Sequence, residues 1–356
     1  MSTGSLQLLT MRGALGATEG ASTTPLRLLY PGVAENVDTS GLQRFATIED
    51  RVAWAKADGL RNIYAGIEDN TLTLSNVPVS YQDIGWWLCT IPGIQSGAGA
   101  GAGTPTTTDT SAYTRAFLVS QVSTVCGAAG GYDAFIEVAQ NDLIGLVGMS
   151  IPGLRCTDMT LTFNKRASGT DTGVLMSGTW QSPGVCTHIT AFTGTLTDRA
   201  QTFALGNSTK SYIDPSTAGS TADTNLTTAV WHWSRTPAWH DGFDGNANHT
   251  SMHFPGNQNT ELTITRKFSD KLELAAYISK GLRKVNILNE GAVVGAATAK
   301  NTLKLEFIGK VDDHTPLHQD GILYATVHYV GMYDATLLSS WQITLINAVS
   351  TAYTAL

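Results

Sequence analysis

The chain has 356 residues, which is enough for one large domain or two medium-sized ones. Charged residues make up only 14% of it, Gly is abundant, and the net charge is −7 with no cluster of Lys and Arg. This composition favours β-rich domains with long loops, or a subunit covered by other subunits, and argues against a protein that grips nucleic acid, because phosphate binding needs clustered cations.

The N-terminal stretch MSTGSLQLLTMRG lacks a charged segment followed by an apolar run, so no signal peptide is expected. No run of about 18 apolar residues occurs, so no transmembrane helix is expected either. The cysteines are too widely spaced for a metal site or a disulfide scaffold, which predicts reduced, buried thiols. They are Cys89, Cys126, Cys156 and Cys186.

Residues 1–60 predict little regular structure beyond a short strand at 26–30. Residues 47–59 are compatible with a short helix, although 51–55 could equally be extended. Residues 60–79 predict two paired strands around a turn at 68–70. The Gly-Ala alternation in 96–111 cannot pack a core and predicts a mobile loop.

β-branched and aromatic residues bounded by turn formers predict strands along the rest of the chain. In the first half these are 113–121, 134–139, 143–149, 158–164 and 173–181. Residues 183–228 are weakly periodic and predict a connection. In the second half the strands are 229–235, 260–268, 282–288, 301–309, 322–332 and 340–348, with a helix near 270–279 and a loop over 311–321.

Two similar segments lie about half the chain apart. NTLTLSNVPVSYQDIGWWL (70–88) and NTELTITRKFSDKLELAAYI (259–278) each pass from a period-two pattern to a helical pattern. The pattern indicates a strand that runs into a helix, twice, and hence two copies of one module.

Few residues indicate chemistry. The segment 231–254 contains His232, His240, His249 and His253 beside Asp241 and Asp244. Their spacing matches no established zinc arrangement, so surface or stacking histidines are favoured over a metal site. Pro316 argues against a helix that would align His314 with His318.

Other catalytic patterns are also missing or weak. No phosphate-binding Gly loop or Gly-x-Ser-x-Gly elbow is present, and the acidic pair Asp312-Asp313 falls in a predicted loop. Trp231 and Trp233 could form a sugar-stacking platform, but a role in the core or at a subunit interface is favoured. The sequence therefore predicts no enzyme, no cofactor and no metal site.

Three segments resemble the major tail tube proteins of long, non-contractile-tailed bacteriophages: RGALGATEGASTTPLRLLYPG (12–32), NTLTLSNVPVSYQDIGWWL (70–88) and GVLMSGTWQSPG (173–184). The C-terminal DGILYATVHYVGMYD and SSWQITLINAV are similar to the last strands of that family. The matching positions are Arg12, Gly13, Ala14, Thr18, Gly20, Thr24, Pro25, Asp83, Trp86, Trp87 and Leu88.

The resemblance implies a mainly β protein with short helices, built from two crossed β-sheets flanked by a helix. Such subunits form rings that stack into a tube, the conduit for genome ejection, in the virion tail after synthesis in the host cytoplasm. The implied partners are further copies of the chain, the tape-measure, tail-tip and terminator proteins, and double-stranded DNA as passing cargo. Trp86, Trp87 and Leu88 would pack the helix onto a sheet.

We expect two tandem tube modules, 1–185 and 200–356, joined by a linker at 186–199. The family closes a ring with six single modules, so three chains would close it here. A channel for DNA should repel phosphate, and alternate strand positions supply candidate acids for its wall. These candidates are Glu137, Asp142, Asp158, Glu261 and Glu306.

Two other classes of protein remain open on the sequence alone. A carbohydrate- or receptor-binding β-sandwich would use Trp231, Trp233 and Trp239. A metal-dependent hydrolase would use the histidine-rich segment 231–254.

Overall fold

The fold is described by a computed structural model and is mainly β with short helices, as predicted. The described residues are 8–16, 27–29, 36–42, 44–51, 60–94, 99, 104–119, 133–142, 145–164, 173–192, 201–214, 221–240, 249, 251–268, 272–296, 298–319 and 321–353. Within them, neither α-helix is long and apolar enough to cross a membrane.

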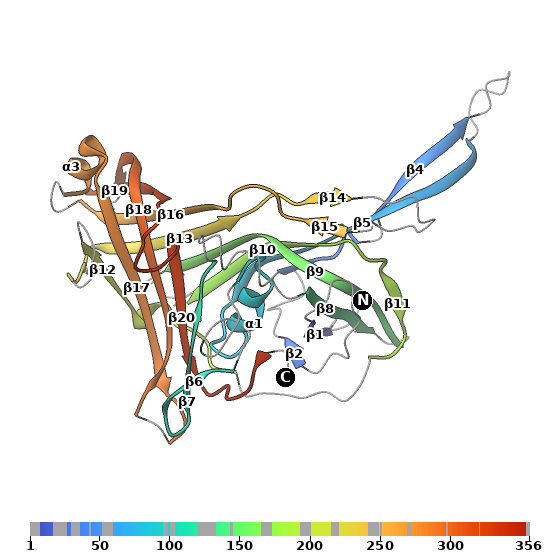
Figure 1. The fold of residues 1–356 in the computed structure, drawn as a ribbon, viewed down its shortest axis with the longest axis horizontal. Coiled ribbons are helices and arrows are strands. Elements are labelled where there is room, and N and C mark those ends of the chain that lie inside the picture. The colour runs from blue at the N-terminus through green and yellow to red at the C-terminus, as the bar shows by residue number, and fades with distance from the viewer. Residues whose placement is uncertain are drawn as a thin grey trace, which may run out of the picture.

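The elements fall into two successive groups (Figure 1). The first group is β1 (Leu8–Gly16), β2 (Arg27–Leu29), β3 (Val37–Asp38), β4 (Arg44–Arg51), β5 (Leu60–Pro78), α1 (Ile84–Cys89), β6 (Thr106–Asp109), β7 (Ala112–Phe117), β8 (Asp133–Asp142), β9 (Gly145–Asn164), β10 (Val174–Ser182) and β11 (Thr187–Ile189). The second is the 3-10 turn η2 (Gly206–Ser208), β12 (Thr209–Asp214), β13 (Leu226–Ser234), β14 (Ala238–His240), β15 (Ser251–His253), β16 (Asn259–Lys267), α3 (Leu272–Ser279), β17 (Leu282–Val293), β18 (Lys300–Gln319), β19 (Ile322–Gly331) and β20 (Trp341–Asn347).

The same pairing scheme occurs in both groups. β5 leads into α1 and pairs with β10, just as β16 leads into α3 and pairs with β19. Each group also has a long strand, β9 or β18, that forms one hairpin with the strand before it and another with the strand after it. The next strand, β11 or β20, then returns to the first half of the long strand. The repeated sequence segments therefore mark a repeated unit of structure.

A β-bulge falls at the same place in both units. Opposite β10, Thr179 faces Asp158 and Trp180 faces Cys156, so one residue of β9 is left over. Opposite β19, His328 faces Asp313 and Tyr329 faces Val311, so one residue of β18 is left over. A bulge re-aims the strand and increases its twist. Its recurrence gives a residue-by-residue correspondence in which Asp158 matches Asp313.

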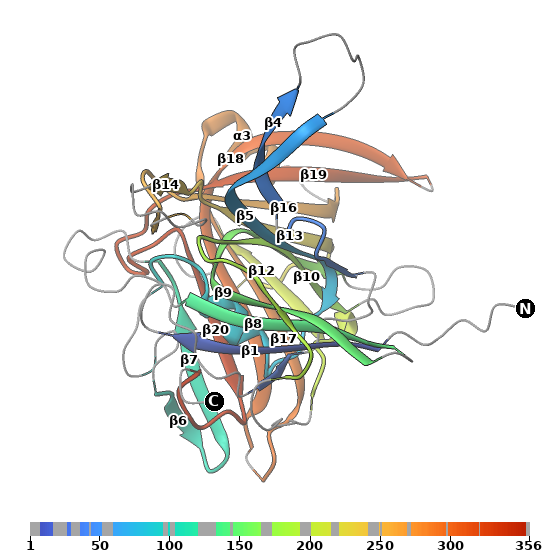
Figure 2. The ribbon, with the colours of Figure 1, turned by 90° about the vertical axis from the view of Figure 1, so that its right-hand side faces the viewer.

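The two units share one sheet. The second half of β9 pairs with β13, and β13 pairs with β16, which gives the strand order β3-β5-β10-β9-β13-β16-β19-β18. The first halves of β9 and β18 leave this sheet and pair with β8 and β17. Figure 1 shows β17 running steeply across the direction of β13 and β16, and Figure 2 shows the molecule turned by 90°.

The core lies between these layers and is continuous across both units. Trp87 packs against Trp86 and against Trp180 of β10, with ring centroids 4.8 Å apart in each pair. Trp86, Trp87 and Leu88 are buried, so α1 lies against the sheet through the predicted side chains. In the second unit Trp231 contacts Trp341 at 4.9 Å.

The helix α3 is fixed differently from α1. Its Glu273 is buried and lies 3.5 Å from Arg266 of β16 and 3.6 Å from Arg283 of β17. The Tyr329 hydroxyl donates a hydrogen bond to Glu273 at 2.6 Å, and burial raises the pKa of Tyr329 well above its ordinary value. A buried charge needs such partners, so this cluster fixes where the helix lies.

The structure corrects several predicted elements. Residues 60–79 were predicted as two strands around a turn at 68–70, but they form the single strand β5, which pairs with β4 and then β10. The predicted strands 143–149 and 158–164 are parts of one strand, β9. The predicted loop at 311–321 is mostly the second half of β18, because pairing with β19 continues to Gln319. Within the predicted mobile loop 96–111, residues 106–109 instead form β6, which pairs with β7, while 96–98 and 100–103 lie outside the described residues.

The predicted module boundaries stay a prediction, but the described elements bear on them. β11 lies inside the predicted linker 186–199 and pairs with β9. The hairpin β6–β7 precedes β8 in the chain, yet β7 pairs with β20 at the other end of the sequence. Asn347 also donates a hydrogen bond to the Tyr81 carbonyl at 2.7 Å. The two units are therefore interlocked.

Candidate functional site: the polar face of the shared sheet

The shared sheet has one buried and one polar face. Alternation along the strands places Leu72, Met159, Trp180, Trp231 and Leu262 in the core. Their strand neighbours point the other way and are half-buried, and most of them are threonines: Thr71, Thr73, Thr160, Thr162, Thr179, Thr228, Thr263, Thr265 and Thr326. Cross-strand rows such as Thr228–Thr265–Thr326 give this face a neutral, hydroxyl-rich surface.

A row of alternating carboxylates and imidazoles crosses this face, and we call it the His–carboxylate ladder. It consists of Asp158, His232, Glu261, His328 and Asp312, from β9, β13, β16, β19 and β18. His232 Nε2 lies 2.7 Å from Asp158 Oδ2, and His232 Nδ1 lies 3.9 Å from Glu261 Oε2. On the other side of Glu261, His328 Nε2 lies 3.3 Å from Oε2, while His328 Nδ1 lies 3.9 Å from Asp312 Oδ2.

The ladder shifts the pKa values of His232 and Glu261. The pKa of His232 is raised, first by its hydrogen bond to Asp158 and further by the charges of Asp158 and Glu261, against the opposing effect of burial. The pKa of Glu261 is lowered, first by a hydrogen bond from Asn259 and then by His328 and His232. Protonated His232 and ionised Glu261 therefore stabilise each other.

We expect the stability of the protein to depend on His232 mainly at acidic pH. A raised folded-state pKa gives stabilisation that is fully present below the ordinary value of 6.5 and is lost as the pH rises through the folded-state pKa. The wild-type protein and His232→Gln should therefore differ more in thermal midpoint at about pH 5.5 than at about pH 8.5. A gap that is equal or larger at alkaline pH would contradict the role given to Asp158 and Glu261.

The structure separates the five predicted channel acids. Asp158 and Glu261 lie on the polar face, joined through His232. Glu137 is fully buried within the chain and cannot present its charge to a channel. Glu306 lies on the outer part of β18 between Lys284 at 3.3 Å and Lys304 at 3.1 Å. The side chain of Asp142 lies outside the described residues.

The histidines of 231–254 do not form one site among the described residues. His232 belongs to the ladder, whereas His249 stacks on Trp239 with ring centroids 4.3 Å apart. His253 contacts the Ser251 hydroxyl at 2.8 Å. The described residues contain no group of His, Cys, Asp and Glu that could hold a metal ion, and Asp241 and Asp244 lie outside them.

Burial confirms the core role that was favoured for Trp231 and Trp233 over a sugar-stacking platform. Trp231 and Trp233 are both fully buried in the core and offer no ring face to a ligand. Cys89, Cys156 and Cys186 are buried and reduced, as predicted, while Cys126 lies outside the described residues. The pKa of the Cys156 thiol is raised well above its ordinary value, chiefly by burial, which makes it an inert packing group.

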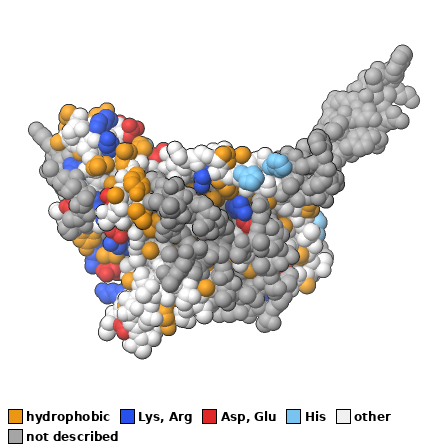
Figure 3. Space-filling view, viewed as in Figure 1, with side chains coloured by type: hydrophobic (Ala, Val, Ile, Leu, Met, Phe, Trp, Pro, Cys, Tyr) orange, Lys and Arg blue, Asp and Glu red, His pale blue; other side chains and the backbone are white. Residues whose placement is uncertain are grey.

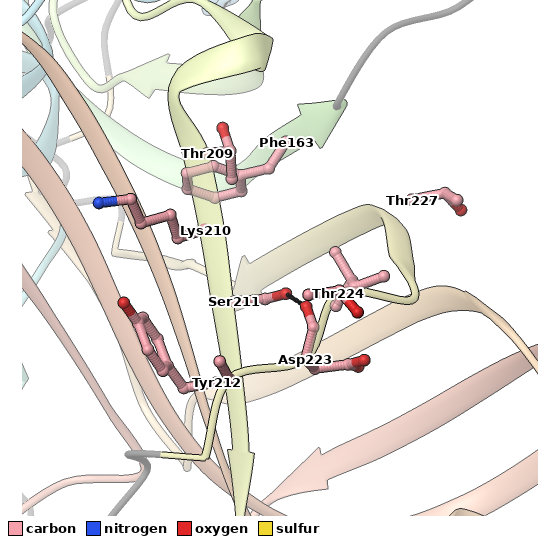
Figure 4. Close-up of a pocket in the computed structure, with 10 residues that line it drawn as sticks. Phe163, Thr209, Lys210, Ser211, Tyr212, Asp223, Thr224 and Thr227 are labelled. Carbon is pink, nitrogen blue, oxygen red and sulfur yellow. Dashed lines mark hydrogen bonds between the residues drawn. The ribbon is translucent and has the colours of Figure 1, made fainter. Parts of the chain in front are cut away.

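A cavity of about 170 Å³ lies between β12 and the start of β13 (Figure 4). Ser211 donates a hydrogen bond across it to the Asp223 carbonyl at 2.7 Å. Its charged side chains are already paired: Lys210 with Glu290 at 2.7 Å, and Asp223 with Arg266 at 3.3 Å. On the face seen in Figure 3, described acidic and basic side chains are also mixed rather than gathered by sign.

Sequence reasoning missed His232 and His328 as members of the polar face. Their positions alternate with buried residues on β13 and β19, which is a signal that the sequence contains. Their partners, however, are supplied by strands far away in the chain, so the ladder could not be found without the pairing register.

The sequence matches no family model and no curated protein. The fold and the polar face therefore provide the evidence on function.

Proposed function

We propose that this chain is a structural virion protein that polymerises as stacked rings into the tail tube of a long, non-contractile-tailed bacteriophage. The tube would conduct the genome into the host, with double-stranded DNA as non-specific cargo. Tape-measure, tail-tip and terminator proteins would be its other partners. The observation that supports the proposal most concerns the long strands β9 and β18. The second half of β9 pairs with a strand on each side, whereas the second half of β18 pairs with a described strand on one side only.

Both edges of β9 are paired over its second half. Residues Asp158–Phe163 pair with β10 on one side, and Asp158–Asn164 pair with β13 on the other. The matching stretch of β18, Asp313–Gln319, pairs with β19 on one side. β17 reaches no further than Lys310, and no described strand of the chain lies beside Asp313–Gln319 on that second side.

The opposite end of the sheet offers the complement. β3 pairs with β5 as β13 pairs with β16, so β3 is the first unit's counterpart of β13. A second chain could therefore place its β3 against Asp313–Gln319 and repeat the contact that joins the two units within one chain. Such a head-to-tail contact forms a ring when the rotation closes, and a closed ring removes the exposed strand edges.

The polar face supports the same function. If the shared sheets of neighbouring chains were continuous, the threonine-rich face would line a single surface. Hydroxyl groups and half-exposed acids offer a phosphate backbone few fixed cationic partners.

Electron microscopy of the purified protein tests the proposal. We expect rings or tubes with a central hole, and three chains in each ring, because each chain holds two units. Rings of six full chains would contradict the count, and a protein that stays monomeric at high concentration would contradict the function. The alternative, a carbohydrate-binding β-sandwich, is less well supported because Trp231 and Trp233 are buried.

A further inference from the structure

The two histidines of the ladder occupy positions where a bare cation would be most harmful to the proposed function. Both lie on the polar face and are about a quarter to a third exposed, at 31% for His232 and 27% for His328. An imidazolium at such a position would offer a phosphodiester backbone a fixed partner, and the ring would repeat it once per chain.

Each imidazole, however, sits between carboxylates from both neighbouring strands. His232 has Asp158 on one side and Glu261 on the other. His328 has Glu261 on one side and Asp312 on the other, with Asp313 directly opposite it across the strand pair. Both ring nitrogens of each imidazole therefore face a carboxylate.

The carboxylates of the ladder can compensate the charge of its imidazoles. The ladder contains three carboxylates and two imidazoles, so its negative groups outnumber the positive charges that its imidazoles could carry. The ladder thus stays negative whether or not its imidazoles are protonated. Lys280 Nζ donates a hydrogen bond to the Asp312 carbonyl at 3.4 Å, and Lys310 is exposed on β18 two residues before Asp312.

We propose that the His–carboxylate ladder keeps the polar face free of uncompensated imidazolium, so that its histidines add no fixed partner for a passing linear polyphosphate such as duplex DNA. The proposal rests on the proposed function for its biological role. Asp158 and Glu261 act in it as shielding residues, and His232 is the group that they shield.

The test first removes the carboxylates of Asp158 and Glu261 and then replaces His232. Asp158→Asn with Glu261→Gln leaves His232 without a carboxylate partner and preserves the shapes of both side chains. The readout is binding of a short fluorescent DNA duplex to the full-length protein, followed by anisotropy over a range of salt concentrations at about pH 5.5 and about pH 8.

The wild-type protein should bind the duplex equally weakly at both pH values. The double variant should bind more tightly at the acidic pH, and its plot of log K against log salt should steepen by roughly one unit per exposed imidazolium. Adding His232→Gln to the double variant should remove most of the acid-dependent gain, because His328 also loses Glu261 but keeps Asp312 beside its other ring nitrogen. That triple variant is the matched control, because it differs only at the shielded group.

Either of two outcomes would overturn the ladder proposal: a double variant that binds no better at acidic pH, or a triple variant that binds as the double variant does. Thermal melts establish that each variant is folded, and microscopy of the same samples keeps the two proposals apart. Rings without a His232-dependent gain in DNA binding would be compatible with the proposed function and would contradict the ladder proposal. A His232-dependent gain without rings would support the ladder and contradict the tube.

Discussion

A chain that carries Asp38→Cys and Leu317→Cys is expected to form disulfide-linked multimers under mild oxidation, whereas each single variant stays uncrosslinked. The repeat predicts this pair. Val230 of β13 faces Thr162 of β9, Asp38 is the counterpart of Val230, and Leu317 is the counterpart of Thr162. Facing residues of an antiparallel pair are close enough for a disulfide.

The link cannot form within one chain. β3 and β18 end opposite sides of the shared sheet, and the strands between them separate the two sites by roughly 30 Å, at about 4.8 Å per strand. The described native cysteines are buried, so they should contribute little background. A ring of three chains should stop the series at a covalent trimer.

The register has its own control. Asp38→Cys paired with Thr315→Cys moves one thiol two residues along the same face of β18, which makes the two positions diagonal neighbours roughly 7–8 Å apart. This pair should link poorly. Equal yields from both pairs would mean that the chains meet without the predicted strand pairing, and an unbroken series of larger multimers would mean an open filament.

Trp180→Ala should be among the most destabilising single changes in the chain, at about 3–5 kcal/mol of unfolding free energy. Trp180 is fully buried, packs on Trp87, and donates its indole hydrogen to the Thr90 hydroxyl at 2.7 Å. Alanine would leave a cavity directly beneath α1 and remove the contact that holds the helix to β10.

Denaturant unfolding of the monomeric protein measures this cost. Trp180→Phe is the control, because it keeps an aromatic ring in the core while losing the hydrogen bond, and it should cost clearly less. If both variants lose the same stability, the hydrogen bond to Thr90 rather than the ring packing would hold α1.

The sequence predicted the two strand-to-helix segments because a strand and a helix are each indicated by local periodicity. The alternation around Leu72 and Leu74, and around Leu262 and Ile264, is set by residues that are adjacent in the chain. The helix at Leu272–Ser279 was predicted within a few residues for the same reason. Alternation along the strands also predicted that Asp158 and Glu261 point toward the same face of a sheet.

Pairing between distant strands could not be predicted in this way. Asp158 and His232 are 74 residues apart, and only the register of β13 on β9 brings them together. The loop predicted at Pro316 reflects a real preference, because proline cannot donate to a strand ladder. An edge strand tolerates it, and β18 is at an edge there.

Two strands of this protein are structural members of both layers. β9 and β18 are each 20 residues long, and each pairs with the shared sheet through one half and with the outer strands through the other. Where separate strands formed the two layers, shear would be resisted by side-chain packing alone. Here the continuous backbone of β9 and β18 joins the two layers, so a force applied to the polar face is transmitted directly to the outer strands. A cylinder made of such units should be stiff in bending and resistant to splitting between its inner and outer surfaces.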